Sequence, residues 1–178
     1  ISCPNVASEF GTPFSASAEG AAAVTRTVRK AVSLPISIKL APNVPEISRI
    51  AQAIVAEGAD AITAINTMPA MLIDALAAKP VLSNRTGGLS GPALKPIALR
   101  CVYELAQAVS VPIIGTGGVS SGIDAAEMLM AGATLVGIGS AMIKDGPSVF
   151  AHICTELTTF MCDNGYAQLA DLRGRALP

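Results

Sequence analysis

Two glycine-rich runs in the second half of the chain have the residue types and spacing of an anion-binding site. GTGG (115–118) follows the apolar run VPII, and GIGS (137–140) follows the apolar run TLV. A helical pattern, Ile123–Ala131, connects them. Glycines directly after a strand let the backbone approach a ligand closely, and their N–H groups favour an anion, usually phosphate. We therefore predict a phosphate-binding βαβ unit over 111–140; two tight turns in an ordinary α/β core are the alternative.

Lys39 is the charged residue of an otherwise apolar strand predicted over 35–41. Ile36, Ile38 and Leu40 fall on one face of that strand, and Lys39 falls on the other. An unpaired ammonium group inside a parallel sheet is costly, so it requires an anionic partner or a lowered pKa. We therefore predict that Lys39 faces a ligand. An ion pair with a carboxylate, or a side chain that extends to the rim of the sheet, is the alternative.

Other polar residues at predicted strand ends are further candidates. Cys3 stands just before Pro4, where a free thiol can also be a small buried hydrophobe. Asn5 and Asn66 carry amides that suit a planar amide or carboxylate ligand, and Thr67 adds a hydroxyl group beside Asn66. Capping of turns is the alternative role for the two asparagines.

The order of predicted elements indicates the class of fold. Helices are predicted over 18–32, 43–57, 96–109 and 123–131, from Pro147 to about Asn164, and, as a short helix, over 166–172. Strands are predicted over 35–41, 60–65, 111–114 and 134–136, and the end of a further strand over 1–6. The run 68–95 is predicted to be a long functional loop. Such alternation indicates parallel strands with helical crossovers. The predicted fold is α/β: the C-terminal half or more of a (β/α)8 TIM barrel, as a single incomplete domain over 1–178, with a doubly wound open sheet as the alternative.

Composition argues against several classes of partner. The 178 residues are 51% hydrophobic and 14% charged, with a net charge of −1, 3% aromatic residues and no Trp. Because there is no basic run and no aromatic platform, nucleic-acid binding is disfavoured. No apolar run reaches the roughly 20 residues that a membrane span needs.

Cysteine and histidine usage predicts a cytoplasmic protein without a metal site. The four cysteines show no CxxC spacing, which is typical of reduced thiols. Cys101, Cys154 and Cys162 fall in predicted helices and are expected in the core. His152 has no Cys or carboxylate at metal-ligand spacing, so no metal is predicted. The chain begins with Ile1 rather than Met, which we interpret as the interior of a longer protein.

Six short motifs, taken in this order and spacing, resemble the C-terminal portion of class 1 dihydroorotate dehydrogenases. They are SCPN (2–5), IKL (38–40), INT (65–67), TGGLSGPALKP (86–96), IGTGG (114–118) and GIGS (137–140). The resemblance covers essentially the whole chain and implies an FMN-dependent (β/α)8 barrel. Enzymes of this family oxidise dihydroorotate to orotate in pyrimidine biosynthesis.

The resemblance also implies roles for individual residues. Cys3 matches the catalytic base, which removes the C5 proton of dihydroorotate while a hydride leaves C6 for flavin N5. Lys39 matches a lysine near flavin N1 and O2, where it would stabilise the anionic reduced ring. Orotate contacts are implied for Asn5, Asn66 and Thr67, flavin-lining positions for Ile65 and Gly91, and the grip on the FMN phosphate for Gly117, Gly118, Gly139 and Ser140.

The resemblance further implies partners and a missing part. The run 86–96 is more like the class 1B branch, whose members pair with a subunit that carries FAD and an iron–sulfur cluster and pass electrons to NAD; a homo-oligomer is expected as well. The N-terminal half of the family has no counterpart in this chain, so the chain alone is expected neither to hold FMN tightly nor to turn over. Another phosphate- or FMN-binding TIM-barrel enzyme, and an inactive fragment that needs a complementary chain, are the alternatives.

Overall fold

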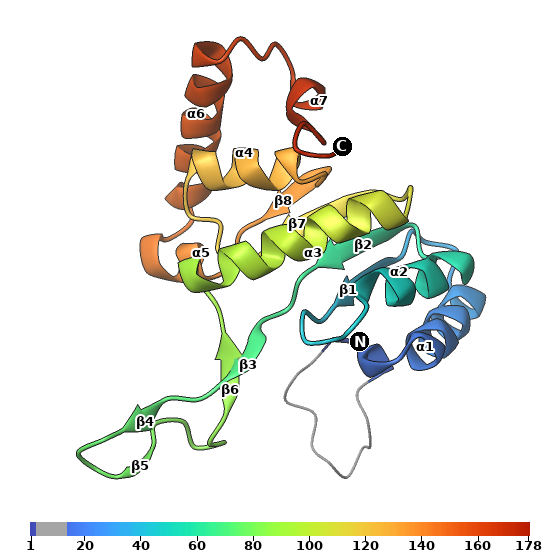
Figure 1. The fold of residues 1–178 in the computed structure, drawn as a ribbon, viewed down its shortest axis with the longest axis vertical. Helices are drawn as coiled ribbons and strands as arrows, with labels where there is room; N and C mark the ends of the chain where they lie inside the picture. Colours follow the sequence, from blue (N-terminus) through green and yellow to red (C-terminus); the bar gives the residue numbers. More distant parts are fainter. Residues whose placement is uncertain (3–13) are drawn as a thin grey trace.

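Parallel strands that follow one another in chain order form the centre of the molecule (Figure 1). The computed structural model describes residues 1–2 and 14–178. The central strands, paired in the order β1-β2-β7-β8, are β1 (Ser37–Leu40), β2 (Ala61–Ala64), β7 (Ile113–Thr116) and β8 (Leu135–Gly137). Each pairing between neighbours is parallel, and helices lie between consecutive strands along the chain. The predicted alternation of parallel strands and helical crossovers is therefore confirmed.

The strand order distinguishes a barrel segment from a doubly wound sheet. In a doubly wound sheet the order reverses at a switch point, which places helices on both faces. Here the order does not reverse, and right-handed crossovers in one direction put the helices on one face. This parallel sheet with helical crossovers is consistent with part of a (β/α)8 barrel, and β1 and β8 are the edges of the sheet within the described residues.

The helices agree with the predicted pattern except at one place. They are α1 (Ala18–Ala31), α2 (Ile47–Ala56), α3 (Lys95–Ala108), α4 (Gly122–Met130), α5 (Ser140–Asp145), α6 (Ser148–Asp163) and α7 (Leu169–Leu172), with 3-10 turns η2 (Phe14–Ala16) and η3 (Pro92–Leu94). Ser17 caps α1 by accepting the N–H of Gly20 at 3.0 Å, and Pro96 occupies the first turn of α3, where its missing N–H costs nothing. The short helix α5, which begins at the second glycine run, was not predicted.

The core lies between the sheet and the helices that cover one of its faces. Along β1, Ile38 and Leu40 are buried while Ser37 and Lys39 are exposed. Side chains alternate between the two faces of a strand, so the buried set packs against the helices and the other set points to the opposite face. Leu135 on β8 is 60% exposed. The face of the sheet away from the helices is therefore open in the described residues.

The excursion 68–95, predicted to be a long functional loop, contains two pairs of short antiparallel strands that were not predicted. β3 (Met68–Ala70) pairs antiparallel with β6 (Gly87–Leu89), and β4 (Ile73–Asp74) pairs antiparallel with β5 (Lys79–Pro80). Figure 1 shows these two ribbons extending away from the sheet. Asp74 Oδ1 accepts the N–H groups of Leu76 and Ala77 at 3.0 Å, which stabilises the turn between β4 and β5. Local pairing of short strands thus supplies the order that the sequence pattern did not reveal.

The helical cysteines divide between core and surface. Cys101 is buried in α3, as predicted, but Cys154 and Cys162 are exposed on α6, so the prediction for these two was wrong. None of the helices in the described part of the chain has the length and apolar character needed to cross a membrane.

Candidate functional site

The carboxyl ends of the parallel strands border a pocket of about 270 Å³. In a parallel sheet these ends lie at one edge, where (β/α)8 barrels place their active sites. The predicted site residues that the structure describes all line this pocket: Lys39, Ile65, Asn66, Thr67, Gly91, Gly117, Gly118, Gly139 and Ser140. The topology therefore brings together residues that are far apart in the sequence.

Each strand contributes to the pocket through the residues at its end. Lys39 comes from β1 itself, and Ile65–Thr67 follow β2, where the peptide bond between Ala64 and Ile65 is cis. The first glycine run overlaps the end of β7 and the second overlaps the end of β8. Gly91, at the end of the excursion, has a φ of 79°, a conformation that favours glycine.

Two predicted residues, Cys3 and Asn5, lie outside the described residues, and their roles stay predictions. The residue before them in the sequence, Ser2, lies against the end of β2. Asn66 Nδ2 donates to the carbonyl oxygen of Ser2 at 2.5 Å and approaches Ser2 Oγ at 3.2 Å. Asn66 Oδ1 accepts the N–H of Thr67 at 2.8 Å. These contacts fix the orientation of the amide group at the pocket wall.

Lys39 lies at the pocket, but the prediction that its ammonium group is buried inside the sheet was wrong. Its side chain is exposed on the open face of the sheet rather than buried inside it. Within the described residues it forms no salt bridge. Lys39 is exposed because it alternates with the buried Ile38 and Leu40, so its side chain lies on the face of the sheet opposite the helices. Lys39 is therefore a cation at the pocket with no described counter-ion.

The first glycine run has a backbone that only glycine accommodates easily. Gly117 has a φ of 139° and Gly118 a φ of 76°. A Cβ on Gly117 would lie 2.8 Å from Ala98 Cβ, and one on Gly118 would lie 2.7 Å from the backbone nitrogen of Lys95. The loop therefore packs directly against the start of α3. Among the described residues, no hydrogen bond engages the N–H of Gly117 or Gly118.

The second glycine run differs, because the protein leaves space beside Gly139. Apart from Gly139 itself and its two neighbours in the chain, no heavy atom of the described residues lies within 4 Å of the position that a Cβ on Gly139 would occupy. The N–H of Gly139 also has no partner among these residues. A Cβ here would reduce the volume of the pocket rather than collide with the protein. An anion that accepts N–H groups from both glycine runs fits this arrangement.

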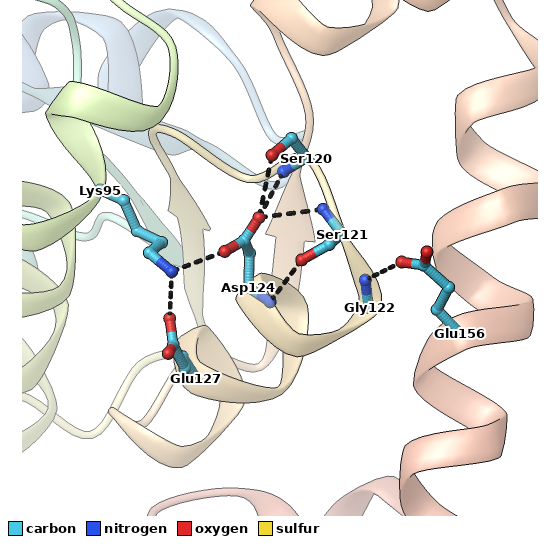
Figure 2. Close-up of polar contacts among 7 residues, drawn as sticks. All are labelled: Lys95, Ser120, Ser121, Gly122, Asp124, Glu127 and Glu156. Carbon is cyan, nitrogen blue, oxygen red and sulfur yellow. Dashed lines mark hydrogen bonds and ion pairs between the residues drawn. The ribbon is translucent and has the colours of Figure 1, made fainter.

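Behind the first glycine run lies a polar network that sequence reasoning missed (Figure 2). Lys95 Nζ at the start of α3 lies 2.6 Å from Asp124 Oδ1 and 2.7 Å from Glu127 Oε2 on α4. Asp124 Oδ2 accepts the N–H groups of Ser120 and Ser121, both at 2.9 Å. The spacing of Ser121 and Asp124 resembles a capping box and could have been found. Their partner Lys95, 29 residues earlier than Asp124, gave no local signal.

The network favours the ionised form of Asp124. Burial by itself would raise the pKa of this carboxyl group, but the hydrogen bonds from Lys95, from the backbone of Ser120 and from Ser121 lower it to about 2. Hydrogen bonds to Asp124 and Glu127 raise the pKa of Lys95. Both Lys95 and Asp124 are therefore charged at neutral pH, and the side chain of Asp124 is only 12% exposed. In the described part of the chain, no group of three or more His, Cys, Asp and Glu side chains is arranged to hold a metal.

Comparisons with known proteins identify the family of this chain. The family model "Dihydroorotate dehydrogenase" matches residues 1–161. The chain is 48% identical over 176 residues to "Dihydroorotate dehydrogenase B (NAD(+)), catalytic subunit" of Geobacillus sp. (strain WCH70), covering 99% of this chain and 56% of that protein. For the proteins of the same name from Bacillus pumilus (strain SAFR-032) and Methanothermobacter thermautotrophicus, the identities are 46% and 44%, over 99% of this chain and 56% and 58% of theirs. The chain thus spans somewhat more than half the length of these curated relatives. The match over most of its residues establishes that this chain belongs to the dihydroorotate dehydrogenase family.

Proposed function

We propose that this chain contributes the substrate- and cofactor-binding part of an FMN-dependent dihydroorotate dehydrogenase, which oxidises dihydroorotate to orotate in de novo pyrimidine biosynthesis. The observation that carries the proposal is the pocket at the carboxyl edge of the sheet, where Lys39, Asn66 and two glycine runs lie together. Family membership and 48% identity to a catalytic subunit support it.

The glycine runs fit a phosphate-bearing cofactor such as FMN. The N–H groups of Gly117, Gly118 and Gly139 lack partners among the described residues, and the space beside Gly139 is open. These groups, with Ser140, would bind the phosphate. Ile65 and Gly91 line the same pocket and would lie against the flavin ring. Bound FMN supplies the hydride acceptor of the reaction.

The other end of the pocket would hold the substrate. Asn66 and Thr67, with Asn5, would donate to and accept from the amide and carboxylate groups of orotate. Cys3 would act as the base that takes the C5 proton. Lys39 brings a positive charge without a described counter-ion to the pocket, and this charge would favour negative charge on the ring system bound there.

Further subunits would complete the enzyme. The relatives are named as catalytic subunits of an NAD(+)-type enzyme. We propose that an electron-transfer subunit with FAD and an iron–sulfur cluster binds this chain and passes electrons to NAD, that the chain forms a homo-oligomer, and that the complex is cytoplasmic. The open face of the sheet would be covered by a segment equivalent to the part of the relatives that this chain does not match. The chain alone would therefore hold FMN weakly and would not turn over.

The test is a flavin titration of the purified protein that contains this chain. We expect bound FMN whose absorption spectrum shifts on addition of orotate and bleaches on addition of dihydroorotate. Bound FMN that responds to neither compound would favour a different FMN-binding barrel enzyme. The alternative of an inactive fragment is tested with residues 1–178, measured once without and once with the complementary segment. Dihydroorotate oxidation that appears only with the segment supports the proposal. No oxidation in either sample contradicts it.

A further inference from the structure

We propose that Lys95 and Asp124 are positioning residues for the phosphate site, because they hold the loop between β7 and α4 in the shape that leaves the N–H groups of Gly117 and Gly118 to the ligand. The inference rests on the proposed function, since it concerns the same phosphate. Neither side chain lines the pocket, so both would act through the loop.

Asp124 fixes the far half of the loop with a single carboxylate group. Its Oδ2 accepts the N–H groups of Ser120 and Ser121 at 2.9 Å and the hydroxyl group of Ser120 at 3.0 Å. Its Oδ1 accepts from Lys95 at 2.6 Å. The Ser121 hydroxyl accepts the N–H of Asp124 at 3.2 Å and closes the cap of α4. The N–H groups of the loop thus serve two partners. Those of Ser120 and Ser121 donate to Asp124, whereas those of Gly117 and Gly118 are left to a ligand.

Lys95 fixes the near half of the loop, both through its backbone and through its side chain. A Cβ on Gly118 would lie 2.7 Å from the N and Cβ atoms of Lys95 and 2.9 Å from the carbonyl oxygen of Gly91, so the loop lies directly on the start of α3. The Lys95 ammonium group then contacts Asp124 and Glu127 on α4 (Figure 2). Because two carboxylates already neutralise it, Lys95 is not available as a direct partner of phosphate.

The other side of the same loop is fixed by α6. Glu156 Oε2 accepts the N–H of Gly122 at 2.6 Å. A Cβ on Gly122 would collide with the backbone of Leu157 and the side chain of Glu156, so α4 begins in direct contact with α6. With both ends of the loop held, the contact most specific to the glycine run is the one between Lys95 and Asp124. Loss of Lys95 would leave Asp124 and Glu127 facing each other without a cation.

The experiment compares FMN with riboflavin, which has the same ring and no phosphate, in the holoprotein that contains this chain. We expect Lys95→Met to weaken FMN binding about tenfold to a hundredfold and to leave riboflavin affinity unchanged. Lys95→Arg should keep most of the preference for FMN. Arg100→Met is the matched control, because Arg100 lies on the same helix and forms an exposed ion pair with Glu104 at 2.7 Å. It should leave the ratio of the two affinities unchanged.

The outcomes separate this inference from the proposed function. A wild-type protein that does not prefer FMN to riboflavin contradicts the phosphate site itself and this inference with it. A wild-type preference that Lys95→Met does not alter, or a loss of both ligands to the same extent, overturns only the role of Lys95. If Lys95→Met does not fold, Asp124→Asn, which keeps the size of the side chain and one acceptor oxygen, must show the selective loss; an unchanged ratio in that variant overturns the inference.

Discussion

The two ends of the central strands carry similar aspartate networks that serve different purposes. At the amino end, Asp60 Oδ2 accepts the N–H of Ile36 at 2.7 Å and binds Arg29 at 2.9 Å. Arg29 also donates to the carbonyl oxygens of Val32 and Leu34, at 2.8 and 2.6 Å. At the carboxyl end, Asp124 likewise accepts backbone N–H groups and binds a cation from a neighbouring helix. In both places one carboxylate joins a backbone turn to a helix.

What differs is the environment of each network. The Asp60 side chain is 49% exposed and does not border the pocket at the strand ends, whereas Asp124 is 12% exposed and supports a loop that does border it. The amino-end network joins α1 to the starts of β1 and β2, which serves stability. The carboxyl-end network holds a loop that borders the pocket. The same electrostatic device therefore stabilises the fold at one end and, by our proposal, prepares a binding site at the other.

Removal of the proposed base, Cys3, should give the largest effect of all. Cys3→Ala should slow flavin reduction by dihydroorotate by about 10²- to 10⁴-fold, because proton abstraction loses its general base, while orotate still binds. Stopped-flow absorbance of the complete flavoprotein measures this rate. Cys154→Ala, at an exposed position on α6, is the control. Wild-type reduction kinetics in Cys3→Ala would remove Cys3 from the mechanism.

A methyl group beside the second glycine run should affect the ligand more than the fold. Gly139→Ala places a Cβ where no described atom other than those of its chain neighbours lies within 4 Å. We therefore expect FMN affinity to fall about tenfold with little change in the urea midpoint. Gly146→Ala provides the opposite case: its Cβ is equally free of neighbours, but its φ of 72° and ψ of −176° strain an L-residue, at a cost of about 1–3 kcal/mol. Gly146 lies outside the pocket. A Gly139→Ala protein with wild-type FMN affinity would argue against phosphate binding at this loop.

The pH dependence of stability should distinguish Asp124 from an ordinary surface carboxylate. Its pKa is lowered from 3.8 to about 2 in the folded protein. A lowered pKa stabilises the folded state above the unfolded pKa, and this contribution is lost as the pH falls through the folded pKa. At neutral pH, the free energy of unfolding of the wild type should therefore exceed that of Asp124→Asn by about 2 kcal/mol. This difference should shrink between about pH 4 and pH 2. Urea unfolding across this range measures it; a difference that does not depend on pH would contradict the assignment.

Asp60→Asn, at the amino end, should lower stability with the same direction of pH dependence as Asp124→Asn. Unlike Asp124→Asn, it should not change the preference for FMN over riboflavin. The hydrogen bond from the N–H of Ile36 is the main cause that lowers the pKa of Asp60, with a further contribution from Arg29. We expect a lower urea midpoint that approaches the wild-type value in acid, together with an unchanged ratio of FMN to riboflavin affinity. A changed ratio would remove the distinction between the two ends of the sheet.

The smallest effect is expected for Arg26→Met, next to the amino-end network. Arg26 pairs with Glu57, but 53% of its side chain is exposed. Exposed ion pairs contribute little because water and salt screen them. The urea midpoint and the FMN-to-riboflavin ratio should both match the wild type within error. A clear loss of stability would mean that the amino end depends on more than the pair of Arg29 and Asp60.

Much of the fold and of the pocket was predictable because the signals are local. Apolar runs that end in glycine define the positions of β7 and β8, and the alternation of helices and strands predicts parallel strands whose carboxyl ends meet at one edge. Asn66, Gly117 and Gly139 could therefore be assigned to a common site before any coordinates were known. The order of the short motifs likewise predicts the family, because it depends only on residue identity and spacing.

The features that could not be predicted depend on which segments pack together. The exposure of Lys39 depends on what covers the second face of the sheet, and nothing within the strand records this. The pairing of Lys95 with Asp124 joins helices α3 and α4 across 29 residues, and the ribbons of the excursion depend on pairing between strands too short to show a period. Residue identity and local periodicity determined where the strands end and which groups gather there. The tertiary structure alone decided which side chains are buried and which charges meet, because burial and ion pairing arise between segments rather than within them.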